Sequence, residues 1–177
     1  IPLQHIDDTI LKTMGRRTSE KEIKNLIEKI RNAGDVAIRS TFIVGFPGET
    51  DEQYQKLYDF IGEYKLNYAG FFAYSKEDGT AAAKLKNQIP QAVKNKRLKN
   101  ITALQSKVIF ENNKNYVGKS LKVLYEGIDY DNNIFYGRPE FCAPEVDAKV
   151  LFSSDYLVNV GNFYDVKITG ANGYDHV

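Results

Sequence analysis

The segment from Arg39 to Thr50 contains the residues best placed for chemistry. It reads Arg-Ser-Thr-Phe-Ile-Val-Gly-Phe-Pro-Gly-Glu-Thr and runs from an apolar stretch through a Gly-Phe-Pro-Gly turn into a helix start. In α/β proteins ligands bind at the carboxyl ends of strands, where Gly45 and Gly48 would let the backbone approach a ligand closely. An ordinary connection between a strand and a helix uses the same residue types. The segment is therefore either a binding loop or a well-capped turn.

Gln4 and His5 are the next residues whose side chains could contact a ligand. They follow an apolar Ile-Pro-Leu start, which we interpret as the end of a buried strand. An amide and an imidazole projecting from that strand end could hydrogen-bond a ribose, but a plain polar strand end has the same sequence. Arg39 begins the following apolar run, so it needs a carboxylate or ligand partner if it is covered and none if it is exposed. Residues 74–80 either line the same rim or form a simple polar turn.

Alternating helix and strand patterns in the first half indicate how these residues are positioned. Capping boxes at residues 19–22 and 50–53 predict two helix starts, each followed by apolar residues at helical spacing. The apolar run 38–45 lacks strict alternation and predicts a strand buried on both faces, and residues 70–74 predict another short strand. Strands that alternate with helices favour a parallel sheet, as in an α/β barrel or a doubly wound fold.

The second half has a different pattern. Residues 91–111 are rich in lysine and predict one long connecting helix. After it the hydrophobic period becomes two, at residues 121–125, 146–152 and 164–168, and about five short strands predict a small OB-like antiparallel barrel. We therefore expect domains at residues 1–90 and 112–177, joined by the helix.

Charge divides the chain at the same place. Through Glu111 there are 18 Lys and Arg against 14 Asp and Glu, whereas from Asn112 onward there are 6 against 9. The first part is thus +4 and the second −3, which supports two modules. Cys142 is the single cysteine, so the chain can form neither an internal disulfide nor a metal site made of several thiolates.

The ends and the hydropathy of the sequence limit the class of protein. No apolar run approaches the roughly 20 residues that span a membrane, and no signal peptide is recognisable, so we expect a cytoplasmic protein. The sequence starts inside an expected strand and without methionine, which predicts a fragment of a longer protein. An unpaired strand edge would favour weak self-association.

Three ordered motifs together resemble the radical S-adenosylmethionine (SAM) methylthiotransferases. They are residues 1–5, residues 39–50, and Phe-x-Tyr-Ser-x-Glu-x-Gly-Thr at residues 72–80. The resemblance covers nearly the whole chain. It implies the C-terminal part of a radical SAM partial (β/α) barrel, followed by a small all-β, OB-like barrel called the TRAM domain.

The resemblance also implies the cofactors. The full-length enzyme would use SAM and two 4Fe-4S clusters, one of them held by a Cys-x-x-x-Cys-x-x-Cys loop that is absent here. We expect neither cofactor on this fragment, which contains no catalytic or metal-binding residue of its own and would be inactive alone. By the same resemblance, Gln4 and Arg39 would face the SAM pocket, Ile43 and Gly45 would pack along its adenosine, and Phe72 would close its floor.

Two branches of this family differ in substrate. One modifies an aspartate of the small-subunit ribosomal protein S-twelve, and the other a prenylated adenosine of tRNA. Residues 137–147 and 72–80 are more similar to the ribosomal-protein branch. An acidic barrel also suits a basic ribosomal protein better than it suits tRNA. The tRNA enzyme is the alternative, and a non-catalytic module that binds RNA or protein is an alternative of another class.

Overall fold

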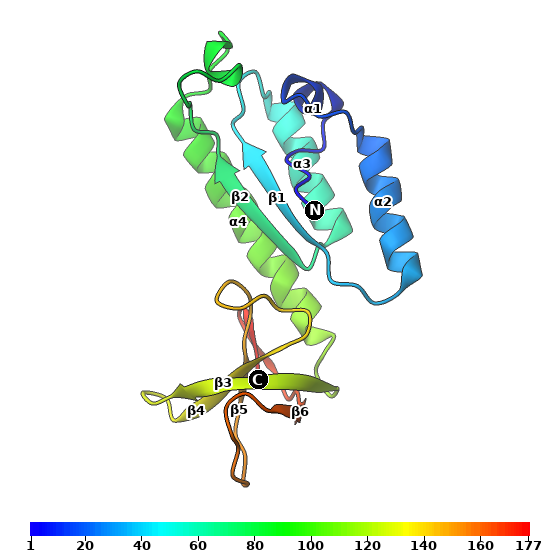
Figure 1. Ribbon diagram of the computed structural model, residues 1–177. Coiled ribbons are helices and arrows are strands. Elements are labelled where there is room, and N and C mark those ends of the chain that lie inside the picture. The colour runs from blue at the N-terminus through cyan, green and yellow to red at the C-terminus, as the bar shows by residue number, and fades with distance from the viewer. The chain divides into compact units, whose positions relative to one another are not determined.

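The computed structural model describes residues 1–177, which form two compact units, Ile1–Val108 and Ile109–Val177 (Figure 1). The first unit contains α1 (Asp8–Thr13), α2 (Glu20–Ala33), β1 (Arg39–Val44), α3 (Asp51–Tyr64), β2 (Tyr68–Ala73), a short 3-10 helix (Ala82–Lys84) and most of α4 (Gln91–Lys114). No helix is both long enough and apolar enough to cross a membrane. The domain boundaries that we expect at residues 90 and 111 stay a prediction.

The α/β prediction for the first unit is confirmed. Strands β1 and β2 pair in parallel, in a register that runs from Arg39 opposite Tyr68 to Val44 opposite Ala73. Gln4 adds an isolated parallel bridge to Phe42 on β1. Along the chain, helix α3 connects β1 to β2 (Figure 1), because two parallel strands need a crossover connection.

Both predicted capping boxes form. Ser19 caps α2 by accepting a hydrogen bond from the N–H of Glu22, whose carboxylate accepts one from the N–H of Ser19 in return. Thr50 and Gln53 make the same reciprocal pair at the start of α3. These bonds satisfy backbone donors that a helix start leaves without partners, which is why both helices begin where the sequence indicates.

The hydrophobic core covers one face of the small sheet. Phe42 and Val44 are fully buried on that face, and the Phe42 ring stacks on Phe71 with a centroid distance of 5.7 Å. The core cluster includes residues from α1, α2, α3 and α4. On the other face Ile43 is half-buried and Phe72 is 60% exposed. The expectation that β1 is buried on both faces was therefore wrong, because the main core covers one face and only a small cluster around Ile10, Phe46 and Tyr74 packs against Ile43.

The second unit is a six-stranded sheet, which confirms the predicted small β domain. Its strands are β3 (Ser120–Asp129), β4 (Ile134–Pro139), β5 (Val150–Phe152), β6 (Phe163–Lys167), β7 (Ala171–Asn172) and β8 (Asp175–His176). Their order in the sheet is β6-β3-β4-β5-β8-β7. The alternation from Val146 had suggested a longer β5, but Asp147 accepts a bond from the N–H of Ala143, which holds this stretch in a turn.

An unpartnered histidine lies in the core of the second unit. His176 is fully buried and makes edge contacts with the rings of Tyr116 and Phe141, at centroid distances of 5.2 and 6.2 Å. Neither of its ring nitrogens has a hydrogen-bond partner. Burial lowers the pKa of His176, and the nearby charge of Asp175 acts in the opposite direction. The folded unit therefore favours the neutral ring.

This histidine makes the second unit sensitive to mild acid. Because the unfolded chain binds a proton near pH 6.5 and the folded chain binds it only at lower pH, stability is full above about pH 6.5 and falls below it, by at most about 1.4 kcal/mol per pH unit. Urea unfolding at pH 7.5 and 5.5 measures this loss. His176→Phe should remove the loss of stability that is due to this histidine. Any loss caused by protonation of carboxylates should remain. An unchanged pH dependence in the variant would contradict the prediction.

Candidate functional site

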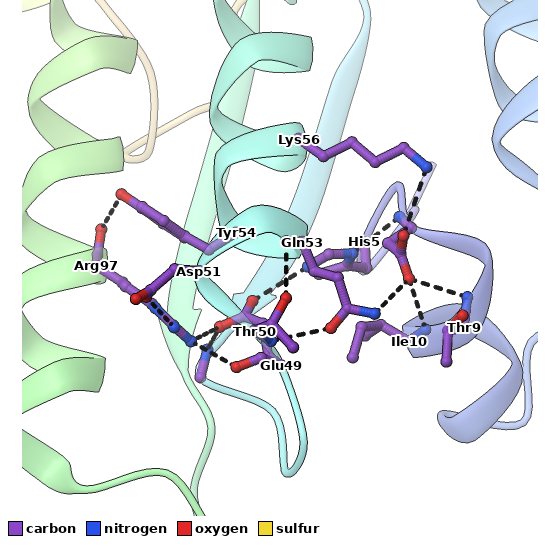
Figure 2. Close-up of polar contacts among 12 residues, drawn as sticks. His5, Thr9, Ile10, Glu49, Thr50, Asp51, Gln53, Tyr54, Lys56 and Arg97 are labelled. Atoms are coloured by element: carbon purple, nitrogen blue, oxygen red, sulfur yellow. Dashed lines mark hydrogen bonds and ion pairs between the residues drawn. The ribbon is translucent and has the colours of Figure 1, made fainter.

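Glu49 is the centre of a buried polar cluster at the carboxyl end of β1 (Figure 2). Its side chain is fully buried, and the carboxylate accepts hydrogen bonds from three different segments of the chain. The donors are the N–H of Gly45 at 2.6 Å, His5 Nε2 at 3.1 Å and Arg97 Nη1 at 2.5 Å. A buried carboxylate is stable only with such partners, so the cluster joins the chain start, the turn and α4.

Two glycines allow the tight turn that places the Glu49 carboxylate next to the end of β1. Gly45 and Gly48 have φ angles of +71° and +87°, which residues with a side chain adopt at a cost. At position 45 a Cβ atom would also lie 2.5 Å from Cγ of Lys94. Lys94 is itself buried and donates to the Tyr74 carbonyl at 3.0 Å. Gly45 is therefore required by packing as well as by backbone conformation.

His5 belongs to the scaffold. Its Nδ1 accepts a hydrogen bond from the N–H of Asp7 at 3.0 Å, so Nε2 carries the proton that is donated to Glu49. The side chain is fully buried and both ring nitrogens are used. Of the two interpretations open for His5, the structure excludes a side chain that projects toward a ligand, because the ring is buried against the Glu49 carboxylate.

Arg97 ties helix α4 to this cluster, and nothing in the sequence had singled it out. Besides the Glu49 carboxylate, its guanidinium binds the Glu49 carbonyl at 3.1 Å and Asp51 Oδ1 at 2.6 Å. Tyr54 donates its hydroxyl proton to the Arg97 carbonyl at 3.0 Å. Burial raises the pKa of Tyr54 to about 12, so the hydroxyl remains a donor. One buried arginine thus fixes how α4 lies against the turn.

Asp7 holds α1 against α3 beside this cluster. One of its carboxylate oxygens caps α1 through the N–H groups of Thr9 and Ile10 and also accepts from Gln53 at 2.9 Å (Figure 2). Burial would raise the pKa of Asp7, but the hydrogen bond from Ile10 and the charge of Lys56 outweigh it, and the pKa is lowered. The carboxylate therefore stays ionised at neutral pH.

Gln4 and Ile43 line a hollow on the uncovered face of the sheet. The hollow has a volume of about 230 Å³ and is also lined by Thr13, Met14, Arg16, Phe46, Ala81 and Ala82. Gln4 has a φ of +70°, held by its N–H bond to the Thr41 carbonyl and by the bond that its own carbonyl accepts from Ile43. Non-glycine residues in this conformation are uncommon and often lie at functional sites.

The structure brings some of the expected site residues together and separates others. Phe72 pairs in register with Ile43, so both side chains lie on the uncovered face near Gln4. Gly45 is buried at the end of the same strand. Arg39 is exposed at the opposite end, about 16 Å away along the strand, and its guanidinium lies over the Tyr68 ring at 4.9 Å.

The second unit has a groove of its own, of about 480 Å³, beside β6. Its lining includes Tyr156 and Leu157, whose side chains are 84% and 91% exposed, together with Asp165 and Lys167. The unit carries 6 Lys and Arg against 10 Asp and Glu, a net charge of −4. Exposed apolar side chains on an acidic unit are suited to binding a basic partner that has apolar residues.

Comparisons with known proteins find one family match in each unit. Residues 1–61 match the radical SAM superfamily and residues 117–177 match the TRAM domain. The chain is 46% identical over 177 residues to "Ribosomal protein uS12 methylthiotransferase RimO" of Alkaliphilus oremlandii, covering 99% of this chain and 40% of that protein. Proteins of the same name from Acetivibrio thermocellus and Elusimicrobium minutum are 39% and 43% identical, each over 99% of this chain and over 39% and 40% of their own lengths. The chain thus spans about two fifths of these relatives.

Replacing the central carboxylate tests the cluster. Glu49→Gln keeps the size but leaves the buried Arg97 without its closest counter-charge, which should lower the free energy of unfolding by about 3 kcal/mol. The control is Asp51→Asn, which removes the other carboxylate partner of Arg97. Because the Asp51 side chain is 91% exposed, its loss should cost less than about 1 kcal/mol. Urea denaturation measures both, and similar losses would show that Glu49 is not the centre.

Proposed function

We propose that this chain is the C-terminal part of a radical SAM methylthiotransferase, an enzyme that methylthiolates an aspartate of ribosomal protein uS12. The observation that carries the proposal is the similarity to uS12 methylthiotransferases over 99% of this chain, at 39–46% identity. The order of a radical SAM region followed by a TRAM domain supports it. The tRNA-modifying branch is the less favoured alternative.

The uncovered face of β1 and β2 supports a SAM site. Gln4 offers an amide that can donate and accept hydrogen bonds, and Ile43 and Phe72 offer apolar surface of the kind that packs on an adenine ring. Gly45 holds the end of the strand in place. Arg39 joins this set if the ligand extends along the strand. When bound, SAM supplies the radical and the methyl group, while these residues bind and orient it.

The 4Fe-4S clusters of the proposed enzyme do not fit residues of this chain. Such clusters need three or four thiolates, and Cys142 is single, buried and located in the second unit. The ligands of both clusters would have to come from the part of the enzyme outside these 177 residues. What this chain contributes is the binding face for SAM and the TRAM unit.

We place the docking of the ribosomal protein on the TRAM unit. Its net charge of −4 is opposite to that of a basic ribosomal protein, and opposite fields speed encounter and fix orientation. Tyr156 and Leu157 are exposed at the groove and supply apolar contacts that charge alone does not give. Incubating the full-length enzyme with uS12 and with tRNA, and measuring mass gain by mass spectrometry, tests the substrate. Modification of tRNA alone would overturn the proposal.

Gln4→Asn tests the SAM site, because asparagine tolerates a positive φ but its amide is shorter. Loss of one hydrogen bond should weaken SAM binding by about 10-fold in the full-length enzyme, measured by isothermal titration calorimetry. Gln91→Asn, at an exposed position on α4, is the control and should bind normally. Unchanged affinity in Gln4→Asn would remove this residue from the site.

The docking proposal predicts a defect in substrate binding alone. The double variant Tyr156→Ala and Leu157→Ala should raise KM for uS12 on the order of 10-fold and leave kcat unchanged, because the side chains act before the reaction. Steady-state kinetics measures both constants. Tyr130→Ala, which is equally exposed at 84% but lies outside the groove lining, should leave KM unchanged. Equal effects of the two changes would argue against the groove.

A further inference from the structure

The positive charge of the first unit is concentrated in one stretch. Residues 1–75 contain 10 Lys and Arg against 11 Asp and Glu, whereas residues 76–108 contain 8 against 2. Between residues 79 and 110 there is no carboxylate side chain at all. Two of the cations in this stretch, Lys94 and Arg97, are buried with the partners described above. The others are available at the surface.

We call the five exposed lysines of this stretch the basic strip, namely Lys84 and Lys86 before α4 and Lys96, Lys99 and Lys107 on it. None of the five makes an ion pair within the chain. At about 100° per residue, the three on α4 fall within an arc of about 80° and extend over about 16 Å of the helix. The buried residues of the same helix, such as Ile101 and Gln105, lie on its other side.

We infer that the basic strip binds the phosphate backbone of RNA, so that the enzyme takes its protein substrate while that protein is attached to ribosomal RNA. This inference rests on the proposed function, and the RNA in it is a docking partner and not the molecule modified. Unpaired lysines in a row repel one another, and polyanion binding relieves that repulsion. Lysines contact phosphates, whereas aromatic side chains would be needed to stack on bases. A strip of lysines therefore suits binding that does not depend on the RNA sequence.

The composition of the strip argues against other polyanions. A helix that lies on a membrane inserts large apolar side chains beside its lysines. The exposed residues between the lysines of α4 are instead small or polar, including Asn100, Thr102, Ala103 and Ser106. An acidic protein, such as the TRAM unit of a second copy, is the other possible partner. The charges of that unit are spread over 69 residues, whereas the three α4 lysines share one side of a helix, as contacts to successive phosphates require.

RNA binding by the full-length enzyme tests the inference directly. The probe is a fluorescein-labelled, single-stranded fragment of small-subunit ribosomal RNA, followed by fluorescence anisotropy over a series of salt concentrations. Five phosphate contacts predict a slope of log K against log salt of about −3.5. The triple variant Lys96→Gln, Lys99→Gln and Lys107→Gln should reduce the slope to about −1.4 and weaken binding about 50-fold at about 0.15 M salt.

The matched control removes the same charge elsewhere. Lys12→Gln, Lys21→Gln and Lys29→Gln change three exposed lysines of α1 and α2 and should leave RNA binding nearly unchanged. Equal losses in the two triple variants, or no RNA binding by the unchanged enzyme, would overturn the inference. So would sedimentation that shows self-association lost only in the strip variant, since the strip would then bind a second copy.

An activity assay separates this inference from the proposed function. Both triple variants are assayed on free uS12 and on intact small ribosomal subunits. The strip variant should keep its activity on the free protein and lose on the order of 10-fold or more in kcat/KM on the subunit. An equal loss on both substrates would overturn the inference. Absence of methylthiolation in every case would refute the proposed function and leave the RNA measurement to stand by itself.

Discussion

A single buried carboxylate sets the local structure on which the first unit depends. An ionised group away from water needs several hydrogen-bond donors, and Glu49 takes one each from Gly45, His5 and Arg97. These donors come from three segments that are far apart in the sequence. The hydrogen bonds to this one carboxylate therefore fix the turn after β1, the position of residues 1–5 beside it and the register of α4.

Beside the cluster, supporting residues and residues that line the hollow are close neighbours in the sequence. Gln4 and His5 are neighbours, yet Gln4 lines the hollow while His5 is fully buried behind it. Neither residue lies in a regular strand, and Gln4 has a positive φ that its backbone bonds to Thr41 and Ile43 hold in place. The covered face of β1 is held by Phe42 and Val44 in the core, whereas Ile43 on the other face lines the hollow.

Local rules predicted much of the fold, and distant contacts account for what they missed. The capping boxes and the change of hydrophobic period identify the helices, the parallel strand pair and the β domain, because each depends on neighbouring residues. The burial of His5 depends on Glu49, 44 residues away, and no local pattern contains that information. The shortened β5 similarly depends on one side chain, Asp147, bonding to the backbone of a turn. Motif resemblance predicted the family and the branch, which periodicity could not.

The reach of the Glu49 cluster also bears on how the chain is made. Arg97 follows Glu49 by 48 residues, so at synthesis rates of about 5–20 residues per second the carboxylate waits roughly 2–10 s for its closest counter-charge. Until α4 has left the ribosome, burying Glu49 would cost more than leaving it in water. We therefore expect the turn and the strand before it to stay solvated in the nascent chain until α4 is available to complete the first unit.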